Sequence, residues 1–185
     1  MTESFPMEYD IILADPPWSY TGQQDKWGAA AKFYPTMTDD EIYVLDVPYA
    51  SRTPSVVFVW ATGPKLDVAI GAILEWGLHY RGVAFVWVKT KKDGTPIAAQ
   101  GVRPSIVKPL TEFVLVGSTK QTGRPLPLAD ESICQTVFAP KAEHSRKPLE
   151  VQERIERMYP DASKLEMFSR PPLRDGWEHW GNEVG

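Results

Sequence analysis

Short, nearly continuous apolar runs alternate with amphipathic stretches along this chain of 185 residues. Apolar runs without polar alternation are typical of strands that are covered on both faces of a sheet. Such runs predict five buried strands, at residues 9–14, 55–61, 82–89, 111–117 and 164–168. Helices are predicted between them, at residues 38–47, 63–77 and 147–160. This order predicts an α/β fold in which a mainly parallel sheet carries helices on both faces, within a single domain over residues 1–185.

The ends of the predicted helices carry matching signals. Thr38 can cap the first helix, and the acidic residues after it lie where the helix dipole favours anions. Pro64 suits the first position of the second helix, and Gly77 suits its end. These boundaries agree with the apolar pattern.

Three stretches do not fit the alternation: residues 19–37, 90–110 and 118–136. Long loops in a compact domain are commonly functional lids or disordered segments. The second stretch, with the strand end before it, is rich in basic side chains: Lys89, Lys91, Lys92, Arg103 and Lys108. We expect the first two stretches to contact a substrate.

Composition excludes several classes of protein. The single cysteine, Cys134, rules out an internal disulfide and a cysteine zinc cluster, and the three histidines lack metal-ligand spacing, so no metal site is expected. No signal peptide or membrane-spanning run is evident, which predicts a soluble, cytoplasmic protein with no membrane partner. The net charge of −4 argues against binding a nucleic-acid duplex through phosphate contacts alone, although a local basic groove is compatible with it.

The first predicted strand runs into Asp15-Pro16-Pro17-Trp18, which predicts a rigid group of hydrogen-bond acceptors. In an open α/β sheet, ligands bind beyond the carboxyl ends of the strands, where Asp15 would lie. The prolines offer carbonyl oxygens with fixed φ angles and no competing N–H, and Trp18 would add an aromatic face. Such a group suits a planar ligand with an exocyclic amine. The alternative is a strand-ending turn with a core tryptophan.

This tetrapeptide resembles the catalytic motif of the amino-methyltransferases, Asp/Asn/Ser-Pro-Pro-Tyr/Phe/Trp. Its Trp form is similar to the branch that contains the eukaryotic mRNA adenosine N6-methyltransferase (the MT-A70-like group), with its bacterial and phage members. The resemblance continues in the same order over nearly the whole chain, through "YPTMTDDEI" (34–42), "VFVWATG" (57–63), "VWVKT" (86–90), "EFVLVG" (112–117), "HSRKP" (144–148), "LEMFSRP" (165–171) and "WGNE" (180–183).

The resemblance implies a Rossmann-like fold that uses S-adenosylmethionine, with a permuted motif order because the catalytic motif precedes the donor-binding strand at 164–168. It implies that Asp15 and the carbonyl of Pro16 hold the adenine amine, while Pro17 and Trp18 shape the pocket. The substrate-binding residues that it implies are Tyr34, Lys89 and Glu112.

For the methyl donor, the resemblance implies contacts with Asp15, Lys147, Arg170, Asn182 and Glu183. The chain departs from the family in three ways. Glu183 replaces a glutamine, Pro172-Leu173 replaces His-Asn, and the family's earlier strand with an acidic end has no counterpart in this sequence. The donor pocket is therefore expected to be completed differently, by Arg174, Asp175, the N-terminal residues or a partner.

The predicted activity is methyl transfer from S-adenosylmethionine to the exocyclic N6 amine of adenine in nucleic acid. The compact chain favours DNA over RNA, and a homodimer or heterodimer is expected. Three alternatives stay open: an RNA adenosine N6-methyltransferase, a non-catalytic nucleic-acid-binding scaffold subunit of the same fold, and a methyltransferase for a small-molecule or protein amine.

Overall fold

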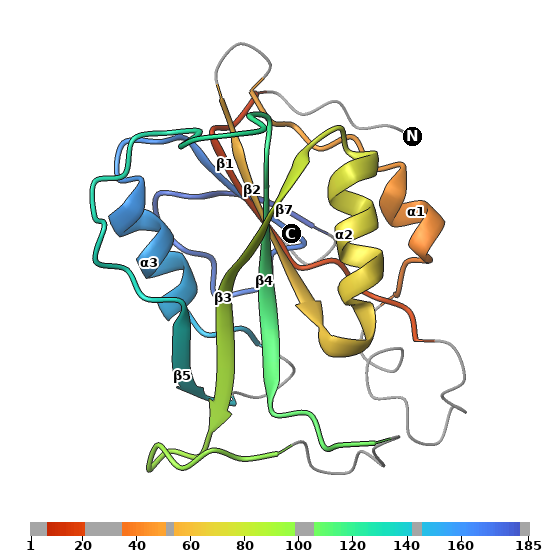
Figure 1. The fold of residues 1–185 in the computed structure, drawn as a ribbon, viewed down its shortest axis with the longest axis vertical. Coiled ribbons are helices and arrows are strands. Elements are labelled where there is room, and N and C mark those ends of the chain that lie inside the picture. The colour runs from red at the N-terminus through yellow and green to blue at the C-terminus, as the bar shows by residue number, and fades with distance from the viewer. Residues whose placement is uncertain (1–6, 21–34, 51–53, 99–105, 142–145, 182–185) are drawn as a thin grey trace.

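The computed structural model describes residues 7–20, 35–50, 54–98, 106–141 and 146–181. Within these residues a seven-stranded sheet has the order β5-β3-β4-β2-β1-β6-β7 (Figure 1). The strands are β1 (Ile11–Ala14), β2 (Val56–Thr62), β3 (His79–Thr90), β4 (Thr111–Ser118), β5 (Thr136–Pro140), β6 (Lys164–Met167) and β7 (Glu178–Trp180).

Most neighbouring strands are parallel, as predicted. β1 pairs in parallel with β2 and β6, β6 with β7, and β3 with β5. The exception is β4, which is antiparallel to both of its neighbours, β2 and β3. β3 and β4 are consecutive and adjacent, so they form a hairpin, which requires opposite directions.

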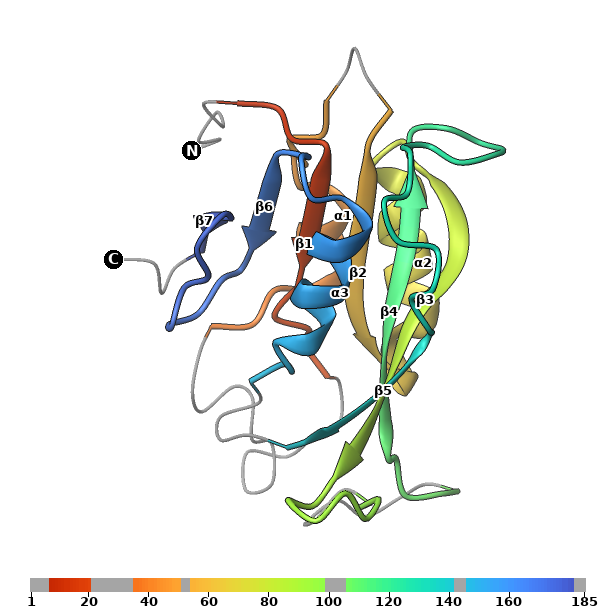
Figure 2. The ribbon, with the colours of Figure 1, turned by 90° about the vertical axis from the view of Figure 1, so that its left-hand side faces the viewer.

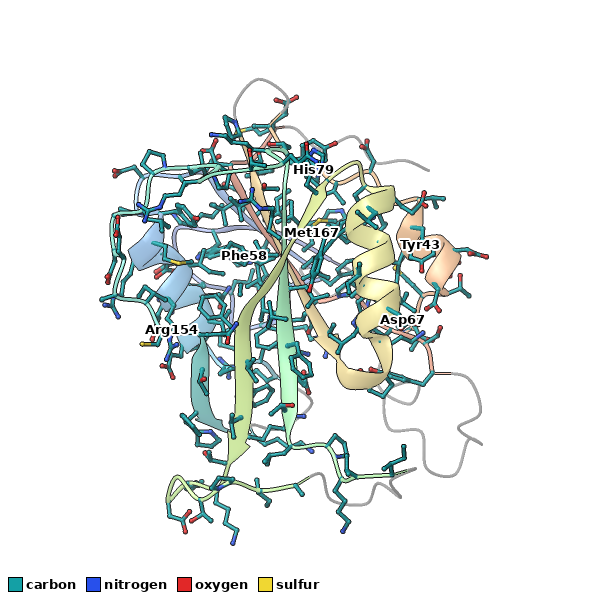
Figure 3. The ribbon with its side chains drawn as sticks, in the orientation of Figure 1. Tyr43, Phe58, Asp67, His79, Arg154 and Met167 are labelled. Atoms are coloured by element: carbon teal, nitrogen blue, oxygen red, sulfur yellow. The ribbon has the colours of Figure 1, made fainter. Side chains whose placement is uncertain are left out.

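Helices cover both faces of the sheet, which confirms the predicted three layers (Figures 1 and 2). α1 (Asp39–Tyr43) and α2 (Leu66–Glu75) pack on one face, and α3 (Glu150–Met158) packs on the other. Each face has its own apolar cluster, with Ile73 of α2 in one and Ile155 of α3 in the other. Figure 3 labels Met167 and Phe58, which belong to the first and second cluster respectively.

The predicted start of α1 is confirmed. Thr38 Oγ1 accepts the Glu41 backbone N–H at 3.2 Å, and Glu41 Oε2 accepts the Thr38 backbone N–H at 2.7 Å. This reciprocal pair is a capping box, which satisfies two backbone donors that the helix leaves open. α1 is shorter than the 38–47 predicted, and Pro64 lies in a 3₁₀ turn (Gly63–Lys65) that leads into α2.

Sequence patterns did not predict β5 and β7, which form the two edges of the sheet. β5 alternates buried and exposed residues, and it follows a proline-rich stretch that we expected to be irregular. β7 is only three residues long. Short edge strands bury too little surface to produce a continuous apolar run.

The register of β1 places the candidate motif. Ala14, the last residue of β1, pairs with Met167, the last residue of β6. The Asp15 backbone N–H then donates to the Met167 carbonyl at 3.3 Å. Asp15 is therefore held where β1 and β6 end together. None of the helices in the described ranges is long and apolar enough to cross a membrane.

Candidate active site

The two proline carbonyls of the motif each accept one backbone hydrogen bond. Trp18 N–H donates to the Pro16 carbonyl at 2.8 Å, and Met37 N–H donates to the Pro17 carbonyl at 2.9 Å. A carbonyl oxygen has two lone pairs, so each oxygen keeps the capacity for a second donor. The loop is thus a fixed row of acceptors beside the Asp15 carboxylate.

Trp18 lies under this loop and not in the open. Its side chain belongs to the core cluster next to α2, the residue is only 5% exposed, and its Nε1–H donates to the Trp60 carbonyl at 3.0 Å. Trp18 is therefore a core tryptophan, as in the alternative of a strand-ending turn, and its role in shaping the pocket stays a prediction. A buried indole N–H needs an acceptor, and the backbone of β2 supplies it inside the core.

Four charged side chains form one connected group, which we call the pocket cluster: Asp15, Lys89, Glu112 and Lys147. Lys147 Nζ lies 2.9 Å from Asp15 and 3.4 Å from Glu112 Oε2. Lys89 Nζ lies 2.5 Å from Glu112 Oε1. All four side chains are 13–21% exposed. The cluster brings together residues that follow β1, end β3, begin β4 and precede α3.

Burial and cations act in opposite directions on Glu112. Burial alone would raise the pKa of its carboxyl, but the charges of Lys147 and Lys89 and their hydrogen bonds outweigh it, so the pKa lies below its ordinary value. Glu112 is therefore ionised at neutral pH. The two lysines also lie over indole rings, Lys147 over Trp60 and Lys89 over Trp87. Both rings are buried in the core, and Trp60 also lines the pocket next to Asp15.

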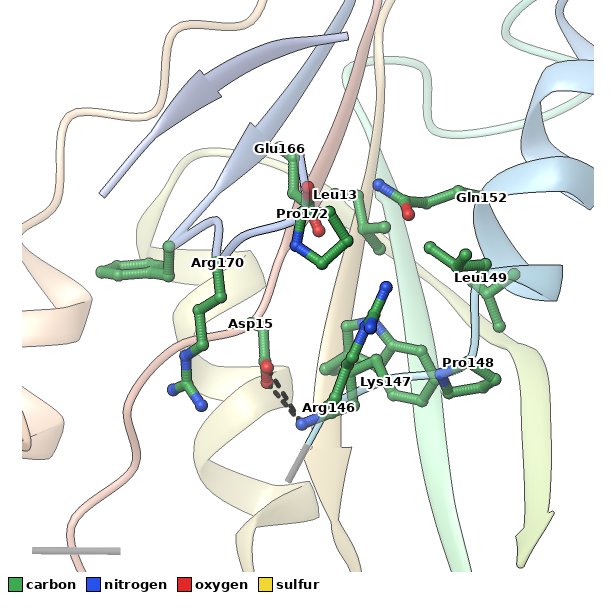
Figure 4. A pocket seen from close by; sticks show the side chains of 13 residues that line it. Leu13, Asp15, Arg146, Lys147, Pro148, Leu149, Gln152, Glu166, Arg170 and Pro172 are labelled. Atoms are coloured by element: carbon green, nitrogen blue, oxygen red, sulfur yellow. Dashed lines mark hydrogen bonds and ion pairs between the residues drawn. The ribbon is translucent and has the colours of Figure 1, made fainter. Parts of the chain in front are cut away.

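A pocket opens next to Asp15, between the end of β6 and the segment that begins α3 (Figure 4). Its polar lining consists of Asp15, Arg146, Lys147, Gln152, Glu166 and Arg170. In Figure 4 the dashed lines join the Asp15 carboxylate to Lys147 at the mouth of this pocket. The predicted residues Asp15, Lys147 and Arg170 therefore share one cavity.

Glu166 is a pocket residue that we did not predict. It lies in β6, and its Oε2 is 3.3 Å from Nδ1 of His179 on β7. Burial raises the pKa of the Glu166 carboxyl, and the His179 charge opposes this only in part. The Gln152 amide lies close enough to lower that pKa, but its buried Nε2 completes no hydrogen bond with a described residue. The sequence did carry a signal for Glu166, because it is a single carboxylate inside a predicted buried strand.

Phe168 lines the pocket with a strained backbone. Its φ is +63°, which a bulky residue adopts only where its surroundings hold it there. Gly181 crosses directly over this turn, and a Cβ at that position would lie 3.0 Å from the Phe168 Cα. Only glycine lets the end of β7 approach so closely.

A second group of polar side chains, which we call the loop clamp, consists of the charged residues Glu153, Glu156 and Arg174 together with Trp177. Arg174 donates through Nε and Nη2 to Glu156, the latter bond at 2.7 Å, and Trp177 Nε1–H donates to the same carboxylate at 2.7 Å. The Arg174 guanidinium is thus bound to α3, and Arg174 is not among the described residues that line the pocket. That Arg174 completes the donor pocket stays a prediction.

Tyr34, Asn182 and Glu183 lie outside the described residues, so their predicted roles stay predictions. In the part of the chain that the structure describes, no three His, Cys, Asp or Glu side chains gather in a way that could hold a metal ion.

The mostly parallel seven-stranded sheet, with helices on both faces, is a Rossmann-like α/β fold of the methyltransferase type. The chain matches the MT-A70 family over residues 9–183 and belongs to that family. It is 32% identical to the Type II methyltransferase M.MunI of Mycoplasma sp over 206 aligned positions, which cover 100% of this chain and 83% of that relative.

Other relatives carry adenosine in their names. The chain is 31% identical over 179 positions to the probable N(6)-adenosine-methyltransferase MT-A70-like of Oryza sativa. It is 28% identical over 178 positions to the human N(6)-adenosine-methyltransferase catalytic subunit METTL3. Each alignment covers 96% of this chain but only 23% and 28% of the relative. The chain thus spans most of the Mycoplasma protein and about a quarter of these adenosine methyltransferases.

Proposed function

We propose that this protein transfers a methyl group from S-adenosylmethionine to the N6 amine of adenine in nucleic acid, with DNA as the favoured substrate. The observation that carries the proposal is the position of Asp15. In a chain of the MT-A70 family, its carboxylate stands beside two proline carbonyls at the mouth of a pocket lined with cations.

On the substrate side, Asp15 and the Pro16 carbonyl would accept the two N–H bonds of the adenine amine. The lone pair of that amine is delocalised into the ring, so fixing its N–H bonds orients the lone pair for attack. In this structure the Asp15 carboxylate already accepts a hydrogen bond from Lys147 Nζ. A carboxylate has about four lone-pair sites, so Asp15 can accept the amine without losing Lys147. Transfer would be direct, with Asp15 as acceptor and orienting group.

On the donor side, the pocket residues fit the chemistry of S-adenosylmethionine. Lys147, Arg146 and Arg170 supply positive charge for the carboxylate of the methionine part. Glu166 supplies an acceptor for ribose hydroxyls, and the unsatisfied Gln152 Nε2 supplies a donor. When bound, the donor supplies an electrophilic methyl group. Asn182 and Glu183, directly after Gly181, remain proposed contacts.

The same edge of the sheet supports binding to nucleic acid. The end of the β3–β4 hairpin carries the exposed Lys91, Lys92 and Lys108, and Lys141 after β5 is also exposed. Such side chains suit phosphate contacts even in an acidic protein. Because N6 is paired inside a duplex, the adenine must be flipped out or already single-stranded. A dimer would double this basic surface, and both the dimer and the cytoplasmic location stay predictions.

The preference for DNA rests on coverage. The chain accounts for 83% of the Mycoplasma relative, and type II methyltransferase is a name used for enzymes that modify DNA. RNA is the second candidate, because the plant and human relatives are named N(6)-adenosine-methyltransferases. The intact acceptor row does not favour a non-catalytic scaffold.

The test uses methyl-labelled S-adenosylmethionine and one sequence offered as duplex DNA, single-stranded DNA and RNA. Products are digested to nucleosides and separated by mass spectrometry. Label in N6-methyldeoxyadenosine is the expected result, and label only in N6-methyladenosine would replace DNA by RNA. No label with any substrate, from a folded protein that binds the donor, would overturn the assignment.

A further inference from the structure

His179 on β7 lies behind the donor pocket and is surrounded by acceptors. Its Nε2 is 3.0 Å from the Arg174 carbonyl. Its Nδ1 is 3.1 Å from Ser169 Oγ and 3.3 Å from Glu166 Oε2. The side chain is only 10% exposed, so water has little access to these partners. The protonation state of the ring therefore follows from the protons that its neighbours can supply.

The Arg174 carbonyl can only accept, so Nε2 must carry a proton. Ser169 has one hydroxyl proton, and it points to the Glu166 carbonyl, 2.5 Å away. Two oxygens at that distance require a proton between them, so Ser169 Oγ can only accept from the ring. An ionised Glu166 carboxylate also only accepts. As long as Glu166 is ionised, Nδ1 must therefore carry a proton as well.

We infer that His179 is held as an imidazolium and acts as a positioning residue for the methyl donor, by fixing the Glu166 carboxylate at the pocket wall. This inference rests on the proposed function. Nε2 also ties the imidazolium to the loop that carries Arg174, and Nδ1 ties it to the turn at Ser169. One ring thus holds three segments that surround the pocket: β6, the turn after it and the loop before β7.

The charges around the pair favour this arrangement. Asp15, from the end of β1, repels the Glu166 carboxylate, and the Arg174 guanidinium is bound to Glu156 on α3 and does not neutralise Glu166. Arg170 follows β6 and lines the same pocket. Burial raises the pKa of Glu166, so this carboxylate depends on a nearby cation to stay ionised.

The inference predicts a specific dependence on pH. When the imidazolium loses its proton at higher pH, Nδ1 stops donating and Glu166 loses its cation. When Glu166 gains a proton at lower pH, it stops accepting from the ring. Donor affinity should therefore be highest between the two titrations and fall on both sides.

The first experiment determines the protonation state directly. The ring ¹⁵N resonances of His179 in the intact protein are assigned by comparison with His179→Gln and followed from about pH 5.5 to 9, a range that brackets ordinary histidine titration. Two protonated ring nitrogens at the pH of tightest donor binding are the expected result. A neutral ring at that pH would overturn the inference, independently of the donor affinities that the variants show.

The second experiment measures S-adenosylmethionine binding by calorimetry over the same range. His179→Gln should bind about tenfold more weakly than wild type at the optimum, because a charge-assisted hydrogen bond is lost. His179→Lys keeps a cation throughout, so it should recover affinity and lose the decline at high pH. His79→Gln is the matched control, because His79 is exposed at the start of β3, at the opposite end of the strand from the hairpin (Figure 3).

The donor has titrating groups of its own, so the difference between the wild-type and variant profiles is the measured quantity. Parallel wild-type and His179→Gln profiles would overturn the inference and leave the proposed function standing. A wild type that binds no donor at any pH would overturn both.

Discussion

The pocket cluster and the loop clamp are built from the same kinds of groups but share their cations differently. In the clamp, Arg174 binds Glu156 with two guanidinium nitrogens, and Trp177 adds a third hydrogen bond to the same carboxylate. In the pocket cluster, one ammonium, that of Lys147, lies between the carboxylates of Asp15 and Glu112.

This difference distinguishes a structural anchor from a site. The planar fork of arginine matches a carboxylate in fixed geometry, whereas lysine is a point charge on a flexible stem that can shift between acceptors. The clamp saturates Glu156 and fixes the loop that follows the pocket. The pocket cluster leaves Asp15 with acceptor capacity directed into a cavity (Figure 4). We therefore expect changes in the cluster to affect activity and changes in the clamp to affect stability.

The largest expected effect is that of Asp15→Asn. The amide keeps the size of the side chain but replaces one acceptor by a donor that repels the substrate amine. Methyl transfer should fall about 10³-fold, on the scale of losing a key catalytic hydrogen bond, with the free energy of unfolding nearly unchanged. Asp67→Asn on the exposed face of α2 is the matched control. Near-normal turnover by Asp15→Asn would show that methyl transfer does not depend on the pocket cluster.

An intermediate effect is expected for Arg174→Met, which removes the cation of the clamp and two hydrogen bonds to Glu156. The free energy of unfolding, measured with urea, should fall by about 1–3 kcal/mol. Methyl transfer below the unfolding range should stay within a few-fold of wild type. Arg157→Met on α3, the helix that carries Glu156, is the control: the Arg157 side chain is 60% exposed, so its loss should change little. Lost activity at unchanged stability would place the clamp in the site.

The smallest effect concerns stability in acid. The pKa of Glu112 is lower in the folded protein than its ordinary 4.5, so its carboxylate stabilises the fold above that value and loses this contribution as the pH falls through the folded pKa. The stability difference between wild type and Glu112→Gln should therefore be largest at neutral pH and shrink below pH 4.5.

Glu166 should behave in the opposite way, which sharpens the contrast inside the pocket. Its pKa is raised, mainly by burial, so its ionisation costs stability. Wild type should lose stability relative to Glu166→Gln as the pH rises through the titration of Glu166. Urea unfolding at a series of pH values measures both variants. For each variant, the difference in unfolding free energy from wild type is plotted against pH. Slopes of the same sign for Glu112→Gln and Glu166→Gln would contradict the lowered pKa of Glu112 or the raised pKa of Glu166.

The local patterns predicted the layers and the motif. Continuous apolar runs such as 55–61 became buried strands, and the Thr38 cap formed as its spacing indicated. The family resemblance named Asp15, Lys147 and Arg170, which the fold brings into one pocket. The strands and the helix cap depend on residues that are close in sequence, and the site residues came from a family resemblance that extends over nearly the whole chain.

Contacts between distant residues could not be predicted. Lys147 and Asp15 are separated by 132 positions, and neither residue type reveals the other. The direction of β4 depends on its hairpin with β3, and the burial of Trp18 depends on an acceptor in β2. His179 looks like an isolated histidine until the sheet places it beside Glu166. Pairing across the sheet decides these details.

We propose that the pocket between Asp15 and Glu166 holds the methyl donor. The most direct measurement is a crystal structure of the protein with S-adenosylhomocysteine, the demethylated donor. We expect its carboxylate near Lys147, its ribose near Glu166 and its sulfur toward Asp15. Density for the ligand at another position, or a pocket that is empty at saturating ligand concentration, would contradict the proposed donor site.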